Sequence, residues 1–464
     1  MRRRLVLAVL FLAVLQLLLL GCAAEGEADE GSSAATPAAE PEPEPEAPME
    51  EKEKMALYAA IEGFVGKGWN GSGLFPDPCG QTPIQGVSCD LFNGLSYPTV
   101  LSVGPVLDNS LQCAPDARFS PQLFDLRHLR SLSFYACFPA TNPTPIPATS
   151  WERLAGRLET LEFRTNPGLA GAIPSSLGRL ANLQSLVIIE NNLTGAVPPE
   201  LGGLARLRRL VLSGNGLSGP VPATLGGLRG LLKMDLSNNR LEGTIPPELA
   251  ALESLTLLDL RNNSLAGGLP EFVQGMASLQ DLLLSNNPLG GALMRSGWEK
   301  LPRLATLDLS NAGLVGSIPE SMAALPRLRF LALDHNRLSG SVPAKLAALP
   351  SIGAMYLNGN NLTGPLQFSA GFYQRMGSRF ASWDNPGLCY SDDSAAAATG
   401  DHAPTGVAAC KDVQEAPSVG VRDRVDGSGR KPEASSSLPA SSPAATVTDL
   451  LCLLLIQWVV VVVL

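Results

Sequence analysis

This sequence contains few of the residues on which catalysis and nucleic-acid binding depend. Aromatic residues make up 5% and charged residues 17% of the 464 residues, and there are three histidines. No stripe of lysine and arginine with interleaved aromatic residues marks a nucleic-acid interface. GxSxG, P-loop, HExxH, kinase and CxxC motifs are also missing. The sequence therefore predicts no catalytic residue, cofactor, metal site or nucleic-acid partner, and an enzyme is the least favoured class of function.

Excess negative charge is absent from most of the chain, although the formal net charge is −9. Residues 25–54 hold eleven acidic residues and two lysines, and the remaining 32 acidic residues balance 32 basic ones. That segment is rich in alanine, glutamate and proline, so we expect a disordered acidic spacer. Residues 1–24 have a basic start, an apolar run and small residues at a cleavage point, which predicts a signal peptide. Lipidation of Cys22 is the alternative.

Leucine, glycine and asparagine recur at a fixed interval through the middle of the chain. The step from Asn215 to Asn239, to Asn263 and to Asn287 is 24 residues each time, which is typical of a solenoid. The template LxxLxLxxNxL occurs about ten times within residues 126–366, with Ala312 once at the asparagine position. The LxL portion predicts a strand with both leucines inward. The asparagine is suited to satisfy backbone groups in the buried turn that follows.

Six of the eight cysteines flank this array in pairs, and none lies inside its regular part. Flanking pairs predict disulfides in the two ends of the solenoid and an oxidising compartment. Residues 55–125 and 367–412 are the segments expected to form these N-terminal and C-terminal caps. The expected pairs are Cys79 with Cys89, Cys113 with Cys137, and Cys389 with Cys410.

Short motifs identify a family resemblance. Residues 193–198, 241–246 and 314–319 read LTGAVP, LEGTIP and LVGSIP, and they resemble the plant-specific leucine-rich repeat. The resemblance implies an α/β solenoid: a right-handed horseshoe with a parallel concave β-sheet and a second, smaller sheet around the LxGxIP segments. The N-terminal flank resembles the Piriformospora indica-insensitive protein 2 group. These are plant surface proteins without a kinase, linked to the response to a root-colonising fungus.

The C-terminal segment predicts a lipid anchor. Residues 413–449 are polar and read as a linker, and residues 450–464 are apolar apart from Gln457. This run is shorter than the about 20 residues that a spanning helix needs, and no basic flank follows it. Small residues, a polar spacer and a terminal apolar tail are the pattern of GPI attachment, which we place at Ser436, with Ser435, Ser437 and Ala440 as alternatives. A short membrane helix and an unprocessed secreted form are the alternatives.

The outward residues of the LxL strands are the candidate partner-binding positions. They form a long mixed surface that suits peptide or protein recognition more than catalysis, and we expect its apolar members to be exposed and to mark contacts. Asn70, Asn192, Asn262 and Asn361 begin N-glycosylation sequons. The candidate positions are Glu162, Arg164, Val187, Val211, Lys233, Asp235, Asp259, Arg261, Leu283, Asp308, Phe330 and Tyr356.

These observations predict an extracellular, GPI-anchored recognition or co-receptor protein on the plant plasma membrane. Its role would be in the response to microbes or in development. We expect a peptide or protein ligand on the concave face and a receptor kinase as signalling partner, because the sequence contains no kinase segment. The alternative is a secreted, apoplastic inhibitor of microbial cell-wall-degrading enzymes.

Overall fold

The computed structural model describes residues 47–105, 110–390 and 404–410. The chain divides into two units, 1–414 and 415–464, and every described residue belongs to the first. The predicted signal peptide, residues 25–46 of the spacer, residues 391–403 and 411–412 of the predicted C-terminal cap, the whole linker with Ser436, and the apolar tail lie outside the described residues. Within the described ranges, every helix is too short or too polar to cross a membrane.

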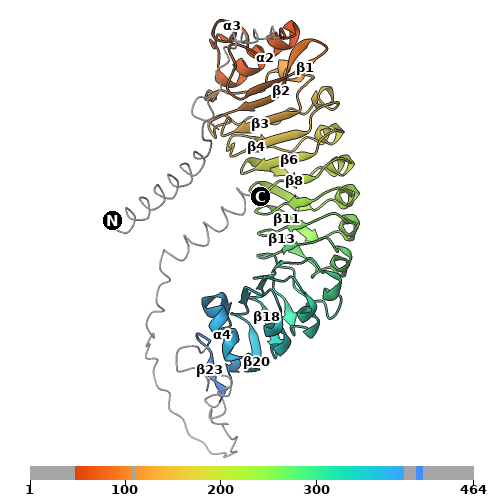
Figure 1. Ribbon diagram of the computed structural model, residues 1–464, viewed down its shortest axis with the longest axis vertical. Coiled ribbons are helices and arrows are strands. Elements are labelled where there is room, and N and C mark those ends of the chain that lie inside the picture. The colour runs from red at the N-terminus through yellow and green to blue at the C-terminus, as the bar shows by residue number, and fades with distance from the viewer. Residues whose placement is uncertain (1–46, 106–109, 391–403, 411–464) are drawn as a thin grey trace, which may run out of the picture. The chain divides into compact units, whose positions relative to one another are not determined.

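A sheet of 13 strands runs along the inner side of the stacked coils (Figure 1). Its first pair, β1 (Val87–Phe92) and β2 (Leu95–Val103), is antiparallel, and all later neighbours are parallel. Along each strand, successive side chains point alternately into the coil and out of it. In β10, for example, Met234 is buried, whereas Lys233 and Asp235 on either side of it face outward. The later strands are β3 (Ser131–Tyr135), β4 (Thr160–Arg164), β6 (Ser185–Ile189), β8 (Arg209–Val211), β10 (Lys233–Asp235), β12 (Leu257–Asp259), β14 (Asp281–Leu283), β15 (Thr306–Asp308), β17 (Phe330–Ala332), β19 (Ala354–Tyr356) and β21 (Phe380–Ala381).

The second sheet expected around the LxGxIP segments is present as two sheets of five strands each. They are separated at residues 289–294, where the sequence reads LGGALM and contains no LxGxIP segment. One isolated bridge between Ala292 and Val315 is formed there. The first sheet contains β5 (Ala170–Gly171), β7 (Asn192–Gly195), β9 (Gly216–Pro220), β11 (Arg240–Thr244) and β13 (Ser264–Ala266), and the second contains β16 (Val315–Gly316), β18 (Arg337–Gly340), β20 (Asn361–Leu366), β22 (Gly387–Tyr390) and β23 (Ala408–Ala409).

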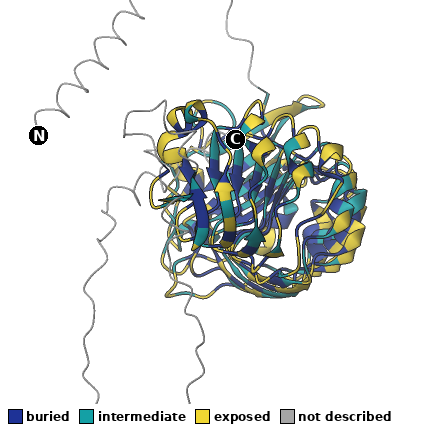
Figure 2. Cartoon of the chain, turned by 90° about the horizontal axis from the view of Figure 1, so that it is seen from below, coloured by how far each residue is buried: buried dark blue, intermediate teal, exposed yellow. Residues whose placement is uncertain are grey.

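Short 3₁₀ helices form the outer side of the coils, where Figure 2 shows many of the exposed residues. Seven of them begin directly after the proline of an LxGxIP-type segment. The φ of these prolines lies between −61° and −76°. Proline suits the start of a helix because its ring fixes φ near the helical value and because it has no backbone N–H that would need a hydrogen-bond acceptor. The helices are η1 (Pro121–Asp125), η2 (Trp151–Arg153), η3 (Ser175–Arg179), η4 (Pro199–Gly203), η5 (Ala223–Gly227), η6 (Pro247–Ala251), η7 (Glu271–Gly275), η8 (Trp298–Lys300), η9 (Glu320–Ala324) and η10 (Ala344–Ala348).

The buried asparagines connect neighbouring coils as the template predicts. Asn263 Oδ1 accepts a hydrogen bond from the backbone N–H of Leu241 at 2.9 Å. Its Nδ2 donates to the carbonyl oxygens of Leu236 and Leu260 at 3.0 Å each. Buried backbone groups in the turn are thereby satisfied, and an unpaired one would cost about 1–3 kcal/mol.

The N-terminal cap begins earlier than the sequence indicated. Helix α2 (Glu51–Val65) covers the end of the core with Leu57, Ile61 and Phe64, and α3 (Gly71–Leu74) follows it. The predicted boundary of the acidic spacer at residue 54 is therefore wrong. The carboxylate of Glu50 caps the helix by accepting the N–H of Glu53 at 2.8 Å. Acidic residues suit this first turn because the N-terminus of a helix carries partial positive charge, so acidic composition alone did not mark disorder here.

The regular coil also continues beyond the predicted end of the array at residue 366. Asn385 Oδ1 accepts the N–H of Leu362 at 3.0 Å, which adds a further asparagine link. β21 and β22 extend the main and second sheets, and α4 (Ala370–Met376) and η11 (Gly377–Arg379) lie between β20 and β21 in sequence. The three disulfides pair the cysteines as predicted: Cys79–Cys89, Cys113–Cys137 and Cys389–Cys410.

Candidate functional site

The parallel register places the outward side chains of the main sheet in columns that run from coil to coil. Lys233 pairs with Leu257 and Asp235 with Asp259 across β10 and β12. The same register continues through β14, β15, β17 and β19. The candidate residues therefore share one continuous face of the sheet, which we call the concave face.

Three candidate residues are less accessible than predicted. Val187, Val211 and Asp259 are 0%, 5% and 4% exposed, so the expectation that the two valines form exposed contacts is wrong. Val187 lies between Glu162 and Val211 on adjacent strands. Neighbouring strands in a sheet are only about 4.8 Å apart, so the side chains on the two adjacent strands enclose the short side chain of Val187. Leu283, Phe330 and Tyr356 remain half-buried and face outward.

A charged cluster lies at the centre of the concave face. Arg261 binds Asp259 with two nitrogens, at 3.0 Å from Nε to Oδ1 and 2.7 Å from Nη2 to Oδ2. Burial opposes the charge of Arg261, but the hydrogen bonds and charge of Asp259, with the charges of Asp308 and Asp235, outweigh it and raise the Arg261 pKa. The pKa of Asp235 is also raised, first by burial and then by the facing carboxylate of Asp259. The N–H and hydroxyl of Ser237 donate to Asp235 Oδ1 at 2.9 and 2.7 Å and offset part of this effect.

Aromatic and acidic side chains meet further along the same face. The rings of Phe330 on β17 and Tyr356 on β19 have centroids 5.7 Å apart. Asp308 on the preceding strand accepts hydrogen bonds from the hydroxyls of Ser285 and Ser310 at 2.7 Å each. Near the other end of the sheet, Arg164 Nε donates to Glu162 Oε2 at 2.8 Å.

A second row of asparagines borders the concave face, and sequence analysis missed it. The Nδ2 of Asn262 donates to Asn238 Oδ1 and that of Asn286 to Asn262 Oδ1 at 2.7 Å each, and Asn311 donates to Asn286 at 2.9 Å. All four have φ between +48° and +56°, a conformation that asparagine tolerates better than most residues. The sequence signal was the asparagine directly before the template asparagine in three successive repeats, and Asn311 holds the same position before Ala312.

The four glycosylation sequons occupy different settings. Asn192 and Asn361 are exposed first residues of β7 and β20. Asn262 belongs to the outer asparagine row, and Asn70 caps α3 by accepting the N–H of Gly73 at 2.9 Å. Glycosylation at all four remains a prediction.

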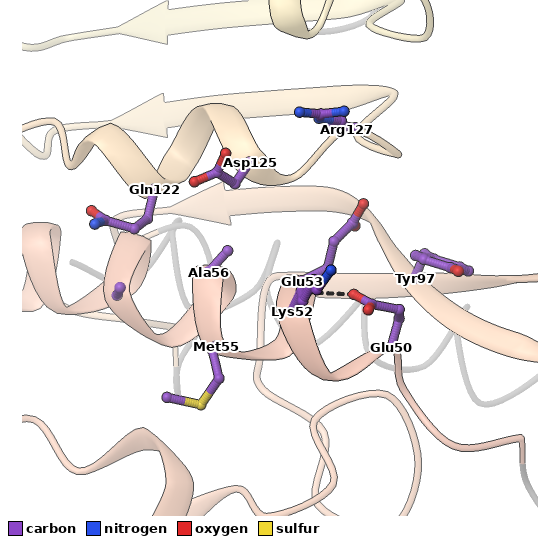
Figure 3. A pocket seen from close by; sticks show the side chains of 10 residues that line it. Glu50, Lys52, Glu53, Met55, Ala56, Tyr97, Gln122, Asp125 and Arg127 are labelled. Carbon is purple, nitrogen blue, oxygen red and sulfur yellow. Dashed lines mark hydrogen bonds between the residues drawn. The ribbon is translucent and has the colours of Figure 1, made fainter.

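A pocket of about 750 Å³ lies away from the concave face, beside α2 and η1 (Figure 3). Glu53, which is 7% exposed, lines it together with Tyr97 and Arg127. Glu53 Oε1 lies 2.6 Å from His128 Nδ1, and the imidazole stacks on Tyr97 with ring centroids 3.9 Å apart. Burial raises the Glu53 pKa more than His128 lowers it. These contacts attach α2 to the first coil, and neither Glu53 nor His128 was a candidate from sequence.

Comparisons with known proteins agree with this geometry. A family model described as a leucine-rich repeat region matches residues 110–382, more than half of the chain. Piriformospora indica-insensitive protein 2 of Arabidopsis thaliana is 55% identical over 146 residues, which cover 31% of this chain and 34% of the relative. Receptor like protein 29 of Arabidopsis thaliana is 34% identical over 154 residues, 31% of each protein. The matched stretch spans about a third of the length of either relative.

Solved structures show the same architecture. A TDR receptor has a TM-score of 0.52 and 31% identity, with 59% of this chain and 46% of that chain covered. The PEPR1-AtPEP1 structure has a TM-score of 0.57 and 27% identity, covering 73% and 49%. Because the family model covers more than half of the chain and the coils have the predicted strand, asparagine turn and proline, the chain belongs to the leucine-rich repeat family.

Proposed function

We propose that this protein is an extracellular recognition or co-receptor module in plant signalling, in the response to microbes or in development. Its concave face binds a peptide or protein partner. The likeness to a TDR receptor and to PEPR1-AtPEP1 supports this choice over an enzyme.

The observation that carries the proposal is the set of large side chains that project from the concave face without joining the core. Leu283, Phe330 and Tyr356 remain half-buried on this face, and Asp308 pairs with Leu283 on the neighbouring strand. Clustered apolar groups at a surface favour association with another molecule, because contact removes them from water. Polar neighbours give such a contact specificity.

A GPI anchor at Ser436 would hold the protein at the outer face of the plasma membrane. The small residues, polar spacer and apolar tail of the sequence support this part of the proposal. A receptor kinase would be the signalling partner, because the described residues contain the solenoid and its caps and no kinase fold.

Site-specific crosslinking on plant membranes tests the binding face. A photoreactive residue at position 283, on the concave face, should capture a partner. The same residue at position 315, on the second sheet where Val315 is 43% exposed, should capture none. Capture from position 315 with none from position 283 would overturn the assignment of the face.

Phosphatidylinositol-specific phospholipase C tests the anchor separately. Release of intact protein from membranes is the expected result. A soluble apoplastic pool with no releasable fraction would instead favour the alternative, a secreted inhibitor of microbial cell-wall-degrading enzymes.

A further inference from the structure

The residues around Ala332 indicate what kind of partner segment the concave face accepts. This inference rests on the proposed function. Ala332 is the last residue of β17 and is 4% exposed. Phe330 precedes it by two residues in the same strand, so both point to the same side of the sheet. Asp334 follows it by two, beyond the end of β17, at the position equivalent to Ser310, whose hydroxyl reaches Asp308 on this side. We call Phe330, Ala332 and Asp334, together with Asp308 and Tyr356 on the neighbouring strands, the Ala332 patch.

The register fixes the four larger side chains around the alanine. Asp308 on β15 pairs with Ala332, and Ala332 pairs with Tyr356 on β19. A methyl group extends little from the sheet, so the surrounding side chains determine what can contact this part of the face. Two of these neighbours are aromatic rings and two are carboxylates.

The aromatic half offers ring surface to a partner. The Phe330 and Tyr356 rings are inclined by 52° with centroids 5.7 Å apart, and both residues are half-buried. A cation within about 6 Å of an aromatic ring face gains electrostatic stabilisation, which increases as water is removed.

The acidic half contains the carboxylate of Asp308, which forms no ion pair among the described residues and which Arg261 influences only from a distance. Hydroxyl groups of Ser285 and Ser310 orient the Asp308 carboxylate without supplying positive charge. Among the described residues, no lysine or arginine lies within ion-pair distance of Asp308. Arg261, on the same face, is bound to Asp259. Asp334 contacts the exposed imidazole of His335 at 2.7 Å.

We propose that the partner is a peptide segment whose arginine side chain binds on the Ala332 patch. The guanidinium plane stacks against Phe330 and Tyr356, and its N–H groups donate to the carboxylates of Asp308 and Asp334. Charge complementarity selects a cation. Arginine fits better than lysine because its planar guanidinium stacks on aromatic rings while it binds carboxylates with several donors.

Selection from a displayed library of random decapeptides against the full chain tests the proposal. Peptides that depend on the concave face should be enriched in arginine at one position. Replacing that arginine by citrulline, which keeps the shape and removes the charge, should weaken binding by about tenfold or more. Asp308→Asn and Phe330→Ala should each weaken binding of the arginine peptide to a similar degree. In these variants, the arginine and citrulline peptides should bind with nearly the same affinity.

Matched variants separate a specific effect from a loss of folding. Leu257→Ala alters the equivalent strand position on β12 and should leave the affinity within about twofold. Phe330→Tyr retains the ring and should bind as the wild type does, even if Phe330→Ala is destabilised.

The possible outcomes distinguish this inference from the function on which it rests. Peptides that bind the concave face equally well with arginine or citrulline would contradict the arginine site and leave the proposed function standing. A library that gives no binder sensitive to Leu283→Arg would contradict the proposed function as well.

Discussion

Asn336 supports Ala312, the one position between Asn166 and Asn385 at which the buried asparagine row lacks a member. Its Oδ1 accepts hydrogen bonds from the backbone N–H groups of both Ala312 and Leu314, each at 3.0 Å. Its Nδ2 donates to the carbonyl oxygens of Leu309 and Leu333 at 2.9 Å. The alanine at position 312 offers no side-chain hydrogen bond, so Asn336 links two coils on its own.

Replacing Asn336 by alanine should therefore destabilise the solenoid strongly. The change leaves several buried backbone groups unpaired, and we expect a loss of about 3 kcal/mol in the free energy of unfolding. Calorimetry and hydrogen exchange at residues 309–336 measure it. Asn311→Gly, which removes one exposed link to Asn286 and keeps a residue that accepts the φ of +48°, is the control and should cost less than about 1 kcal/mol. Equal effects of the two substitutions would refute the role of Asn336.

The disulfide between Cys113 and Cys137 should contribute substantially to stability. It joins residues separated by 24 positions, at the junction of the N-terminal cap and the first coils. For a loop of this size, the chain-entropy model gives a loss of about 3.5 kcal/mol when the bond is removed. Thermal unfolding of the double variant Cys113→Ser with Cys137→Ser measures this loss. A melting temperature equal to that of the wild type would contradict the estimate.

The raised pKa of Asp235 predicts a particular dependence of stability on pH. Above the ordinary value of 3.8 the unfolded carboxyl is ionised, whereas burial and Asp259 disfavour ionisation in the folded chain. The free energy of unfolding should therefore fall as pH rises from 3.8 through the folded pKa. Asp235→Asn retains an oxygen acceptor for Ser237 and removes this penalty, so the variant should gain stability over the wild type as pH rises toward neutrality.

Denaturant unfolding from pH 4 to pH 7 checks the Asp235 prediction. Ser237→Ala provides the opposite change, because loss of the hydroxyl donor leaves the Asp235 charge less stabilised. This variant should lose stability toward neutral pH. A stability difference between Asp235→Asn and the wild type that does not change with pH would disprove the stated sign.

The repeat made the fold predictable, because the same leucine, asparagine, glycine and proline positions repeat the same local geometry. Asn263, for example, binds the preceding coil as its place in the template implied. The start of α2 was not predictable from composition, since the acidic Glu50 and Glu53 read as solvated residues. In the structure, Glu50 caps the helix and Glu53 contacts His128, 75 positions away.

The candidate site was predictable in position but not in accessibility. Strand alternation identified Val187 and Asp259 as outward residues, and the structure confirms that register. Alternation does not report how closely neighbouring strands enclose a short side chain, or that Arg261 covers Asp259. These effects depend on adjacent coils, which are 24 or more positions away in the sequence.

The central claim is that the concave face binds the partner, and one pair of matched substitutions tests it most directly. The measurement is the affinity of the partner captured at position 283 for Leu283→Arg and for Val315→Arg. Both variants introduce the same charge, on the concave face and on the second sheet respectively. The account predicts that Leu283→Arg weakens binding by about tenfold or more and that Val315→Arg changes it by less than about twofold. Undiminished binding by Leu283→Arg, with binding lost in Val315→Arg, would contradict it.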